Sequence, residues 1–596
     1  MQNILASIRK NRAERKPKGG NMAISLPFSL TKKPTYYPAK PFDTLRDALR
    51  ASERQYSERP AFLQKEKGSW RAYTYAEFLD LTEGLGTELY AQGMGGGTFL
   101  VIGENSMEWG CAYLATAGGL GVVVPIDSEI PEEEFRMIAG ECQPTAIFYS
   151  EKQKAKAEWL PPEVRRICFT EIAGLAESGQ RRIYDGDTRY VSLKIDSEAL
   201  AVLLYTSGTT GRPKGVMLSQ KNICSNISDI ATMLWHEPDD IFFAVLPFHH
   251  AYPCTTSLLF PLCRGCCVAI CQGLRYITRD LQEVKPTIIL GVPILIETVY
   301  RKIMINIRRK GPKTEKLVSA LVKLTGNNMA LKRRVFAEIH DSLGGRVRLI
   351  ISGGAAADPA VLKGLHGFGF LAIQGYGLTE CAPLAAVNKD DAFKFESAGL
   401  PTPHGVLDIY DVKSDGTGEI RYKGDNVMLG YYKNPEATAE VLRDGWFYTG
   451  DIGYIDRDGF LYITGRKKNL IVTLGGKNVS PEELEDHLCR NSFVAEAVVV
   501  AYMNETKGDY DIVAVMYPDA ETFTEVYGPR YTSGQIEAEF AKAVAEVNAS
   551  VQSFKHISYF VIRREEFTKT TTKKIKRKGV AEESKDEYLR KLAGMN

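Results

Sequence analysis

Short apolar runs alternate with amphipathic stretches of helical length between residues 98 and 377. Runs rich in Val, Ile and Leu predict parallel strands in a sheet that helices cover on both faces. The runs are FLVIGEN, GVVVPID, TAIFYS, RRICFT, ALAVLLYTS, DIFFAVLPF, CCVAIC, PTIILGVP, RVRLIISGG and FLAIQGYG. They are too many for one mononucleotide-binding fold, so the pattern predicts a larger α/β region.

The pattern changes beyond residue 400, where glycine and aspartate turns separate short strands. DGTGEIRYKGDN and YIDRDGFLYITG predict an antiparallel β region. After GRKKN, the segment PEELEDHLCR predicts a helix, AEAVVVAYM and DIVAVMYP predict strands, and residues 533–548 predict a long helix. We therefore expect a basic N-terminal tail at 1–40, a large domain at 41–466 and a small domain at 467–596.

Composition narrows the class of protein. A chain of 596 residues exceeds a single core, and 75 basic against 73 acidic side chains leave no overall field that would attract nucleic acid. No run of 18 apolar residues predicts a membrane-spanning helix. Eleven irregularly spaced cysteines fit a reducing compartment and predict a cytoplasmic protein. The CRGC stretch predicts a buried strand rather than a zinc site, because no second ligand pair follows.

Two segments are strongly basic. Residues 1–40 begin MQNILASIRKNRAERKPKGG, without the apolar core of a secretory signal. A solvated tail is favoured there over a transit peptide or a membrane-surface foot, and Met22 is an alternative start. Residues 301–348 favour a solvated helical face, with peripheral contact to a membrane surface or an anionic-substrate patch as the alternatives.

The stretch LLYTSGTTGRPKGVMLS predicts a phosphate-binding loop. Ala201 to Tyr205 predict a buried strand, and Ser219 is placed to cap the following helix, so the loop between them lies where α/β sheets bind ligands. Its spacing is not that of a Walker loop. The sequence leaves phosphoryl transfer, nucleotidyl transfer and binding alone open. The expected donors are Thr206, Ser207, Gly208, Thr209, Thr210, Gly211 and Lys214, with Gly215 adding flexibility.

TSGTTGRPKG resembles the phosphate loop of the adenylate-forming superfamily, which includes acyl-CoA synthetases, luciferases and peptide-synthetase adenylation domains. LPFHHAYP, SGGAAAD and QGYGLTE resemble its next motifs, and DGWFYTGDIGYIDRDGFLYITGRKK resembles the signature of fatty acyl-CoA synthetases. The resemblance runs from about residue 45 onward. It implies an α/β fold with a large N-terminal domain of two α/β sheet subdomains plus a distorted β-barrel region, and a small mobile α+β C-terminal domain.

The resemblance also implies roles for individual residues. Glu380 is expected to bind Mg²⁺, and a carboxylate beside a triphosphate does need a cation. Asp451 is expected to accept both ribose hydroxyls, with Arg466 nearby. Catalytic roles are implied for Thr206, Lys214, His250, Glu380 and Lys574, and further ATP or AMP contacts for Gly353, Gly354, Ala355, Gln374, Gly375, Tyr376, Gly377 and Thr379.

The C-terminal motifs carry the remaining expectations. GRKKNLIVTLGGKNVSP implies a hinge at Lys468 and a coenzyme A tunnel at Gly475 and Gly476. FTKTTTKKIKRKG resembles the family's PKTxxGKxxR element. Its register implies that Lys574, with Lys573 as the alternative, is the adenylating lysine.

The resemblance as a whole implies a two-step reaction. A medium- or long-chain fatty acid attacks the α-phosphorus of Mg-ATP to give acyl-AMP and pyrophosphate, and the thiol of coenzyme A then releases AMP. Two alternatives stay open: a ligase that loads an acyl carrier protein, and a non-catalytic nucleotide- or acyl-binding sensor on the same fold. Chain length and the choice between monomer and homodimer stay open as well.

Overall fold

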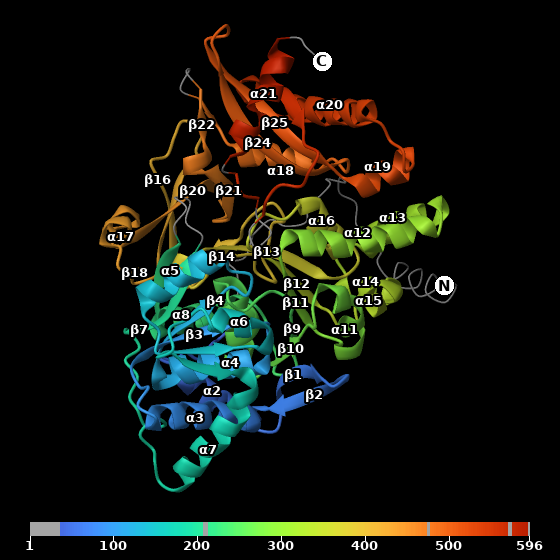
Figure 1. Cartoon of the computed structure of the whole chain (residues 1–596). Helices are drawn as coiled ribbons and strands as arrows, with labels where there is room; N and C mark the ends of the chain where they lie inside the picture. Colours follow the sequence, from blue (N-terminus) through green and yellow to red (C-terminus); the bar gives the residue numbers. More distant parts are fainter. Residues whose placement is uncertain (1–35, 207–212, 474–476, 570–574, 578, 594–596) are drawn as a thin grey trace. The chain divides into compact units, whose positions relative to one another are not determined.

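The computed structural model describes residues 36–206, 213–473, 477–569, 575–577 and 579–593 (Figure 1). The contacts divide this part of the chain into two compact units. Unit 1 comprises the residues up to Gly405 together with Gly424–Pro435, and unit 2 comprises Val406–Lys423 and the residues from Glu436 onward. The expected boundary at residue 466 falls inside unit 2. Packing alone does not test which parts move together, so the boundaries at 40 and 466 stay predictions.

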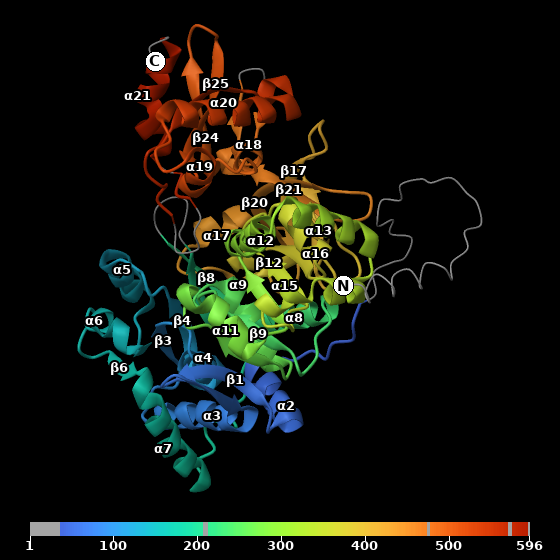
Figure 2. The same ribbon diagram turned by 90° about the vertical axis from the view of Figure 1, so that its right-hand side faces the viewer.

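Unit 1 contains a seven-stranded sheet whose first five strands along the chain are parallel. Its helices include two that lie side by side, α3 and α7 (Figure 2). The order is β18 (Gly430–Tyr431), β8 (Lys214–Ser219), β7 (Leu200–Thr206), β4 (Gly121–Ile126), β3 (Gly97–Ile102), β5 (Ala146–Tyr149) and β6 (Arg165–Cys168). The helices are α2 (Leu45–Tyr56), α3 (Tyr75–Ala91), α4 (Met107–Ala115), α5 (Glu132–Cys142), α6 (Lys154–Ala157) and α7 (Ile172–Tyr184).

A second, nine-stranded sheet completes the α/β part of unit 1. Its order is β15 (Leu400–Pro401), β14 (Leu384–Val387), β13 (Leu371–Gly377), β12 (Leu349–Ser352), β11 (Ile288–Gly291), β9 (Ile241–Ala244), β10 (Cys267–Ile270), β1 (Pro60–Glu66) and β2 (Ser69–Thr74). The strands from β13 to β1 run parallel. Both predicted sheets are therefore present. The CRGC stretch is not a strand as expected, because Cys263 ends a helix and Arg264 and Gly265 form a turn, and the buried strand β10 begins just after it at Cys267. All eleven cysteines are free thiols.

Helix α8 (Gln220–Met233) contacts both sheets, through β7, β8 and β14. Ser219 caps this helix as predicted, because its hydroxyl accepts the amide of Asn222 while the Asn222 side chain accepts the amide of Ser219. The inward positions Ile223, Ile227 and Ala231 are buried, which confirms the helical spacing of the apolar residues.

Six strands of the two α/β sheets were missing from the sequence prediction: β1, β2, β14, β15 and β18 lie outside the predicted apolar runs, and β8 changes the predicted phosphate loop. Residues 206–218 were expected to form a single loop, but Lys214–Ser219 form β8, antiparallel to β7, with Lys214 opposite Thr206. Gly215 lies within this strand, and a Cβ there would come within 2.9 Å of Leu203. The predicted loop thus ends before Lys214, and Gly215 serves strand packing. The expected donors Ser207, Gly208, Thr209, Thr210 and Gly211 lie outside the described residues.

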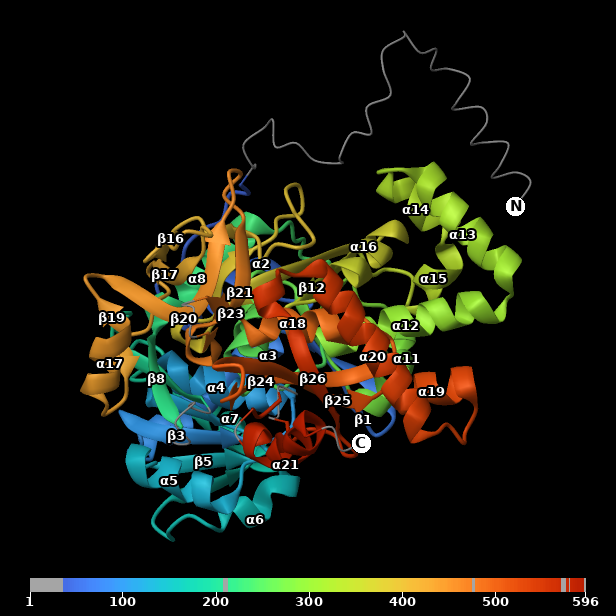
Figure 3. The same cartoon turned by 90° about the horizontal axis from the view of Figure 1, so that it is seen from above.

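The basic segment after β11 is helical. The helices α12 to α15 lie together at one edge of unit 1 (Figure 3), and their inner faces join a large apolar core. They are α12 (Pro293–Arg309), α13 (Pro312–Thr325), α14 (Met329–Val335) and α15 (Ala337–Ser342). The remaining helices of this part of unit 1 are α9 (Ala251–Pro253), α10 (Phe260–Cys263), α11 (Ile277–Val284) and α16 (Pro359–Gly367), of which α10 contacts β10 and α16 contacts β13. Within the described residues, no helix is long and apolar enough to cross a membrane.

Unit 2 contains the predicted antiparallel region and an α+β part. The first comprises β16 (Val406–Tyr410), β17 (Gly418–Lys423), β19 (Leu442–Arg443), β20 (Trp446–Ile455) and β21 (Leu461–Arg466), with α17 (Pro435–Val441). The second comprises β24 (Val494–Asn504), β25 (Asp509–Pro518) and β26 (Ile557–Ile562), with α18 (Pro481–Cys489), α19 (Ala520–Tyr527), α20 (Ser533–Ser550) and α21 (Val580–Leu592). A short ribbon of β22 (Ile471–Val472) and β23 (Asn478–Val479) lies between them in sequence.

Candidate functional site

Lys214 and Glu380 both contact a third residue, Tyr431. The Tyr431 hydroxyl donates to Glu380 Oε1 at 2.8 Å, and Lys214 Nζ lies 4.8 Å from the centre of the Tyr431 ring. Lys214 begins β8, Glu380 lies in a turn after β13, and Tyr431 ends β18. The cation therefore lies at the carboxyl end of β7 and the carboxylate lies just after the carboxyl end of β13. Ligands of α/β proteins bind at such strand ends.

The turn that carries Thr379 and Glu380 is held by backbone contacts. The Leu378 amide donates to Pro383 O at 2.9 Å, and the Met428 amide donates to Glu380 O at 2.8 Å. A Cβ at Gly377 would lie 2.2 Å from Pro383 O, so the chain needs glycine at this position. Both side chains are partly exposed, as a ligand contact requires.

A glycine turn follows β12 at residues 352–357. Gly353 lies against the Tyr252 ring, to which an added Cβ would come within 2.7 Å, and Gly354 has a φ of +83°. Gln374, in β13, accepts the amide of Ala357 at 3.0 Å and so fixes the far end of the turn. Gln374 is thus buried in a structural role, whereas Ala355 and Gly354 are exposed at the turn's surface.

The LPFHH loop carries His250 and is clamped from the other sheet. Asn105, just after β3, donates to Leu246 O at 2.7 Å and accepts the amide of Phe248 at 2.8 Å. The rings of His249 and His250 lie 4.1 Å apart. Burial lowers the pKa of His249, so this imidazole is held neutral beside Asp127. The fixed loop leaves His250 partly exposed at its end.

Tyr252 ties the His250 loop to the glycine turn. Its hydroxyl donates to Ile351 O at 3.3 Å, at the end of β12. Burial raises the pKa of Tyr252 well above its usual range, so its hydroxyl stays protonated. His250, for which a catalytic role is expected, and the turn expected to contact ATP or AMP are therefore connected through Tyr252 within unit 1.

Unit 2 carries the second pair of predicted residues. Asp451 in β20 faces Arg466 in β21 across the hairpin, and Arg466 Nε lies 3.1 Å from Asp451 Oδ1. The Asp451 side chain is 6% exposed and that of Arg466 is 46% exposed. Thr449 accepts the Asp451 amide at 3.1 Å and thereby fixes the strand that carries the carboxylate. The structure thus brings together the two residues that the resemblance expected to lie near one another, while their role toward ribose stays a prediction.

The segment after Arg466 is held by an ion pair and by a side-chain hydrogen bond. Lys467 pairs with the buried carboxylate of Glu419 at 2.7 Å, and the Ser480 hydroxyl donates to Thr464 O at 2.5 Å. Partial desolvation and repulsion from Arg466 lower the pKa of Lys468. Gly475 and Gly476 lie outside the described residues.

The predicted adenylating segment is described on both of its flanks. Lys569 pairs with Ile575 in a short bridge, and the Lys576 amide donates to Thr568 O at 2.8 Å. Arg577 pairs with Glu485 at 2.6 Å and donates to Val499 O at 2.9 Å. These contacts dock the flanks on the α+β part of unit 2. Lys573 and Lys574 lie outside the described residues.

Tyr431 was not found from the sequence. It stands 51 positions from Glu380, and no local pattern of GYYKN links it to either charged residue. The contact follows from strand pairing: β18 pairs with the outer edge of β8, and Tyr431 is the last residue of β18. A search for the strand that pairs with this edge of β8 would therefore have led to Tyr431.

The fold is that of an α/β protein, and a lysine and a glutamate lie at its strand ends, where proteins of this class bind ligands. The profile of the AMP-binding enzyme family matches residues 49–432, which is more than half of the chain. The chain therefore belongs to the AMP-binding enzyme family.

Curated relatives match most of the chain. Long-chain-fatty-acid–CoA ligase FadD15 of Mycobacterium bovis is 29% identical over 560 residues, covering 86% of this chain and 91% of the relative. Human long-chain-fatty-acid–CoA ligase 1 is 29% identical over 510 residues, covering 78% of this chain and 72% of the relative. The crystal structure of ATP-bound MatB from Rhodopseudomonas palustris superposes with a TM-score of 0.70 at 22% identity, covering 91% of this chain and 99% of that one. The last similarity supports the fold alone.

Proposed function

We propose that the protein is an AMP-forming acid–thiol ligase that converts a medium- or long-chain fatty acid to its acyl-CoA through an acyl-AMP intermediate. The observation that carries the proposal is the grouping of Lys214, Tyr431 and Glu380 at the strand ends of a chain from the AMP-binding enzyme family. The relatives named long-chain-fatty-acid–CoA ligases, which match along most of the chain, support the fatty-acid substrate.

The first half-reaction brings two anions together, so the site must supply positive charge in advance. The fatty carboxylate attacks the α-phosphorus of ATP, the bond to the β-phosphate oxygen breaks, and pyrophosphate leaves. Lys214 and the donors of the hairpin from Thr206 onward would hold the β- and γ-phosphates, and Lys574 would hold the oxygens around the reacting phosphorus. His250 would orient the carboxylate, since no protein nucleophile is required.

The nucleoside would be bound by two sets of residues. The turn with Gly353, Gly354 and Ala355, and the strand end from Gln374 to Gly377, would cover the adenine base. The carboxylate of Asp451 would accept both ribose hydroxyls, because one carboxylate has acceptor sites for two vicinal donors. Arg466 pairs with Asp451 across the hairpin and so holds that carboxylate in place.

Mg²⁺ fits the site through Glu380. This ion binds proteins through one or two carboxylates and fills its other positions with substrate phosphates and water. Among the described residues there is no group of three or more His, Cys, Asp and Glu side chains that could hold a metal, so Glu380 would act together with the nucleotide. When bound, Mg²⁺ would draw charge from the phosphate oxygens, while Thr379 would donate to one of them.

The second half-reaction needs a thiol where Lys574 acted. The coenzyme A sulfur attacks the acyl carbon, and AMP leaves with the electrons of the broken acyl–phosphate bond. We propose a hinge at Lys468 that exchanges the adenylating segment for the Gly475–Gly476 loop, which would line the coenzyme A tunnel. Domain movements of this kind take place in microseconds to milliseconds.

A panel of carboxylic acids tests the proposed function. Pyrophosphate release is measured from ATP and each acid, with and without coenzyme A, and the acyl product is identified by mass. We expect medium- and long-chain fatty acids to give pyrophosphate, and coenzyme A to turn over into acyl-CoA. If a thioester forms only on a holo acyl carrier protein, the acceptor is that carrier protein and not coenzyme A. If the protein binds ATP but releases no pyrophosphate with any acid, it is a non-catalytic sensor.

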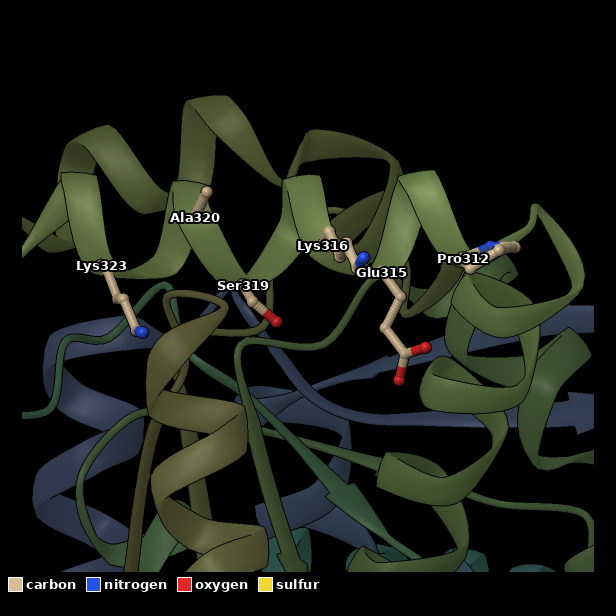
Figure 4. A pocket seen from close by; sticks show the side chains of 6 residues that line it. All are labelled: Pro312, Glu315, Lys316, Ser319, Ala320 and Lys323. Atoms are coloured by element: carbon tan, nitrogen blue, oxygen red, sulfur yellow. The ribbon is translucent and has the colours of Figure 1, made fainter.

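We also propose that α13 contacts the anionic surface of a lipid bilayer, from which a fatty acid would be drawn. Its outward face combines Lys313, Lys316 and Lys323 with Leu317 and Leu324, whose side chains are 40% and 44% exposed. Lys323 lines a surface pocket along α13 together with Pro312, Glu315, Lys316, Ser319 and Ala320 (Figure 4). Lysines beside exposed leucines are typical of helices that lie in a membrane interface.

Vesicle sedimentation tests this contact. The intact protein should sediment with vesicles that contain phosphatidylglycerol and remain free with pure phosphatidylcholine. Replacing Lys316 and Lys323 with Glu should abolish sedimentation, whereas the same change at the exposed Lys152 and Lys154 should not. Binding that ignores lipid charge, or that survives the α13 changes, would contradict the proposal.

A further inference from the structure

Tyr431 occupies a position that keeps two opposite charges apart. Its hydroxyl reaches Glu380 and its ring lies under the Lys214 ammonium group. Among the described residues, Lys214 forms no ion pair with Glu380. A direct pair would neutralise both groups and would turn the phosphate-binding cation toward the protein's own carboxylate rather than toward a ligand.

The position of Tyr431 is fixed by strand pairing and not by a flexible loop. Tyr431 faces Val216 and Gly430 faces Met217 in the β18–β8 register. The side chain is 7% exposed. Because Lys214 lies two residues from Val216 on β8, the same edge of the sheet positions both the cation and the aromatic ring.

The chemistry of tyrosine suits a spacer between these charges. A phenol O–H donates to one carboxylate oxygen and adds no charge, so the remaining lone pairs of Glu380 stay available for a cation. The face of the ring attracts the lysine ammonium group electrostatically without neutralising it. Both charged groups are thereby oriented without a direct ion pair between them.

We propose that Tyr431 is a positioning residue for Mg-ATP, holding Glu380 through its hydroxyl and Lys214 through its ring. This inference rests on the proposed function, because it assigns the two neighbours to metal and phosphate. The hydroxyl and the ring of Tyr431 then have different roles that can be tested separately. The hydroxyl acts on metal-dependent binding, and the ring acts on nucleotide binding with or without metal.

Two substitutions separate these parts, with ATP binding measured by calorimetry in EDTA and across a Mg²⁺ titration. Tyr431→Phe keeps the ring, so affinity in EDTA should stay within about twofold. The Mg²⁺ concentration for half-maximal enhancement of binding should rise about tenfold, as expected for one lost hydrogen bond to a charged group. Tyr431→Leu should show the same rise and should also lose about three- to tenfold in EDTA.

Tyr432→Phe is the matched control, because Tyr432 is the next residue along and packs against the apolar core beside β4 and β5. It should leave both affinities unchanged. The proposal is overturned if Tyr431→Phe keeps the wild-type Mg²⁺ dependence, or if it weakens ATP binding equally with and without Mg²⁺. Thermal unfolding of each variant reports folding separately.

Fatty-acid-dependent pyrophosphate exchange by the wild-type protein separates this inference from the proposed function. If exchange is absent but the two Tyr431 variants still differ as expected, the ligase function fails and the positioning role stands. If exchange is present and the variants bind Mg-ATP like wild type, the positioning role fails alone.

Discussion

Unit 1 and unit 2 each bring a basic and an acidic side chain together, but the two arrangements differ in what they leave available. In unit 1, the Tyr431 ring separates Lys214 from Glu380, and both charged groups stay partly exposed. In unit 2, Asp451 and Arg466 pair directly across a hairpin, and the acid is buried. The first arrangement keeps two charges free for a ligand, whereas the second uses one charge to hold the other in place.

This difference suggests a division of tasks. Adenylyl transfer needs cations that are already placed where negative charge builds during the reaction, which fits the separated pair. Ribose recognition needs a fixed, ionised acceptor, which fits the paired aspartate. Loss of the Lys214 charge should therefore act more on rate than on affinity, and substitutions at Asp451 and Arg466 should act mainly on nucleotide affinity and stability.

The largest effect is expected for Lys574→Ala, which tests whether unit 2 also supplies a catalytic charge. Removing one preorganised donor costs about 10²- to 10³-fold in rate. Acyl-AMP formation should fall by that factor, while conversion of presynthesised acyl-adenylate to acyl-CoA should continue. Each half-reaction is measured by single turnover, and Lys573→Ala is the control. Equal loss of both half-reactions would show that the register or the role is wrong.

Lys214→Met and Asp451→Asn should separate rate from affinity. Loss of the Lys214 charge is expected to lower kcat for adenylation by about 10²-fold, because that charge matters most as pyrophosphate forms. Asp451→Asn is expected to raise the KM for ATP by about tenfold, with a smaller change in kcat. Steady-state kinetics over ATP concentration distinguishes the two. Identical kcat and KM changes in both variants would remove the proposed division of tasks.

Arg466→Met should destabilise unit 2 because it leaves the Asp451 carboxylate buried without its cation. We expect a loss of about 2–3 kcal/mol in the free energy of unfolding. Adding Asp451→Asn should recover part of it, as a double-mutant cycle in urea would reveal. The exposed pair Arg181–Glu177 is the control, and its loss should cost less than about 1 kcal/mol.

Acid pH should weaken unit 1 through His366. Burial and nearby Lys332 lower the pKa of His366 to about 4, below the value of about 6.5 expected in an unfolded chain. Between pH 6.5 and 4, the unfolded chain binds a proton that the folded chain does not, so stability falls as pH falls. Because the pKa is lower by about 2.5, the expected loss of stability reaches about 3 kcal/mol at pH 4.

His366→Asn should reduce this pH dependence of unfolding, whereas the same change at the exposed His556 should not. The comparison is made by urea unfolding at several pH values between 7 and 4. An unchanged slope in His366→Asn would mean that other groups govern acid stability.

The strands and caps of the fold were predictable because their signals are local. Each strand that was predicted in the two α/β sheets is one continuous apolar run, and the Ser219 cap depends on a neighbour three positions away. Strands without such a run, such as β2 (SWRAYT) and β18 (GY), were not predicted. β8 was missed because its first residues belong to the phosphate-loop pattern, which was interpreted as a loop up to the helix. A β-hairpin and an open loop with the same glycines differ only in whether their backbones form strand pairs. Strand pairing depends on residues outside the local stretch, so the local pattern does not reveal it.

The site divides in the same way. Asp451 and Arg466 are linked by a short hairpin, so their proximity follows from the turn between them. Lys214, Glu380 and Tyr431 come from three distant segments, and only the family resemblance pointed to the first two. Tyr431 carries no charge and belongs to no motif that had been identified, so its role depends on a tertiary contact that no single sequence window contains.

The pairing of β18 with β8 sets an order of events during synthesis. Residues 200–219 leave the ribosome long before residues 430–431, yet β8 obtains its outer partner only when β18 arrives. Until then β8 is an open sheet edge, a surface on which other strands can add. A nascent chain halted between these points would be exposed to aggregation, so this one short strand gives a chaperone a defined interval in which to act.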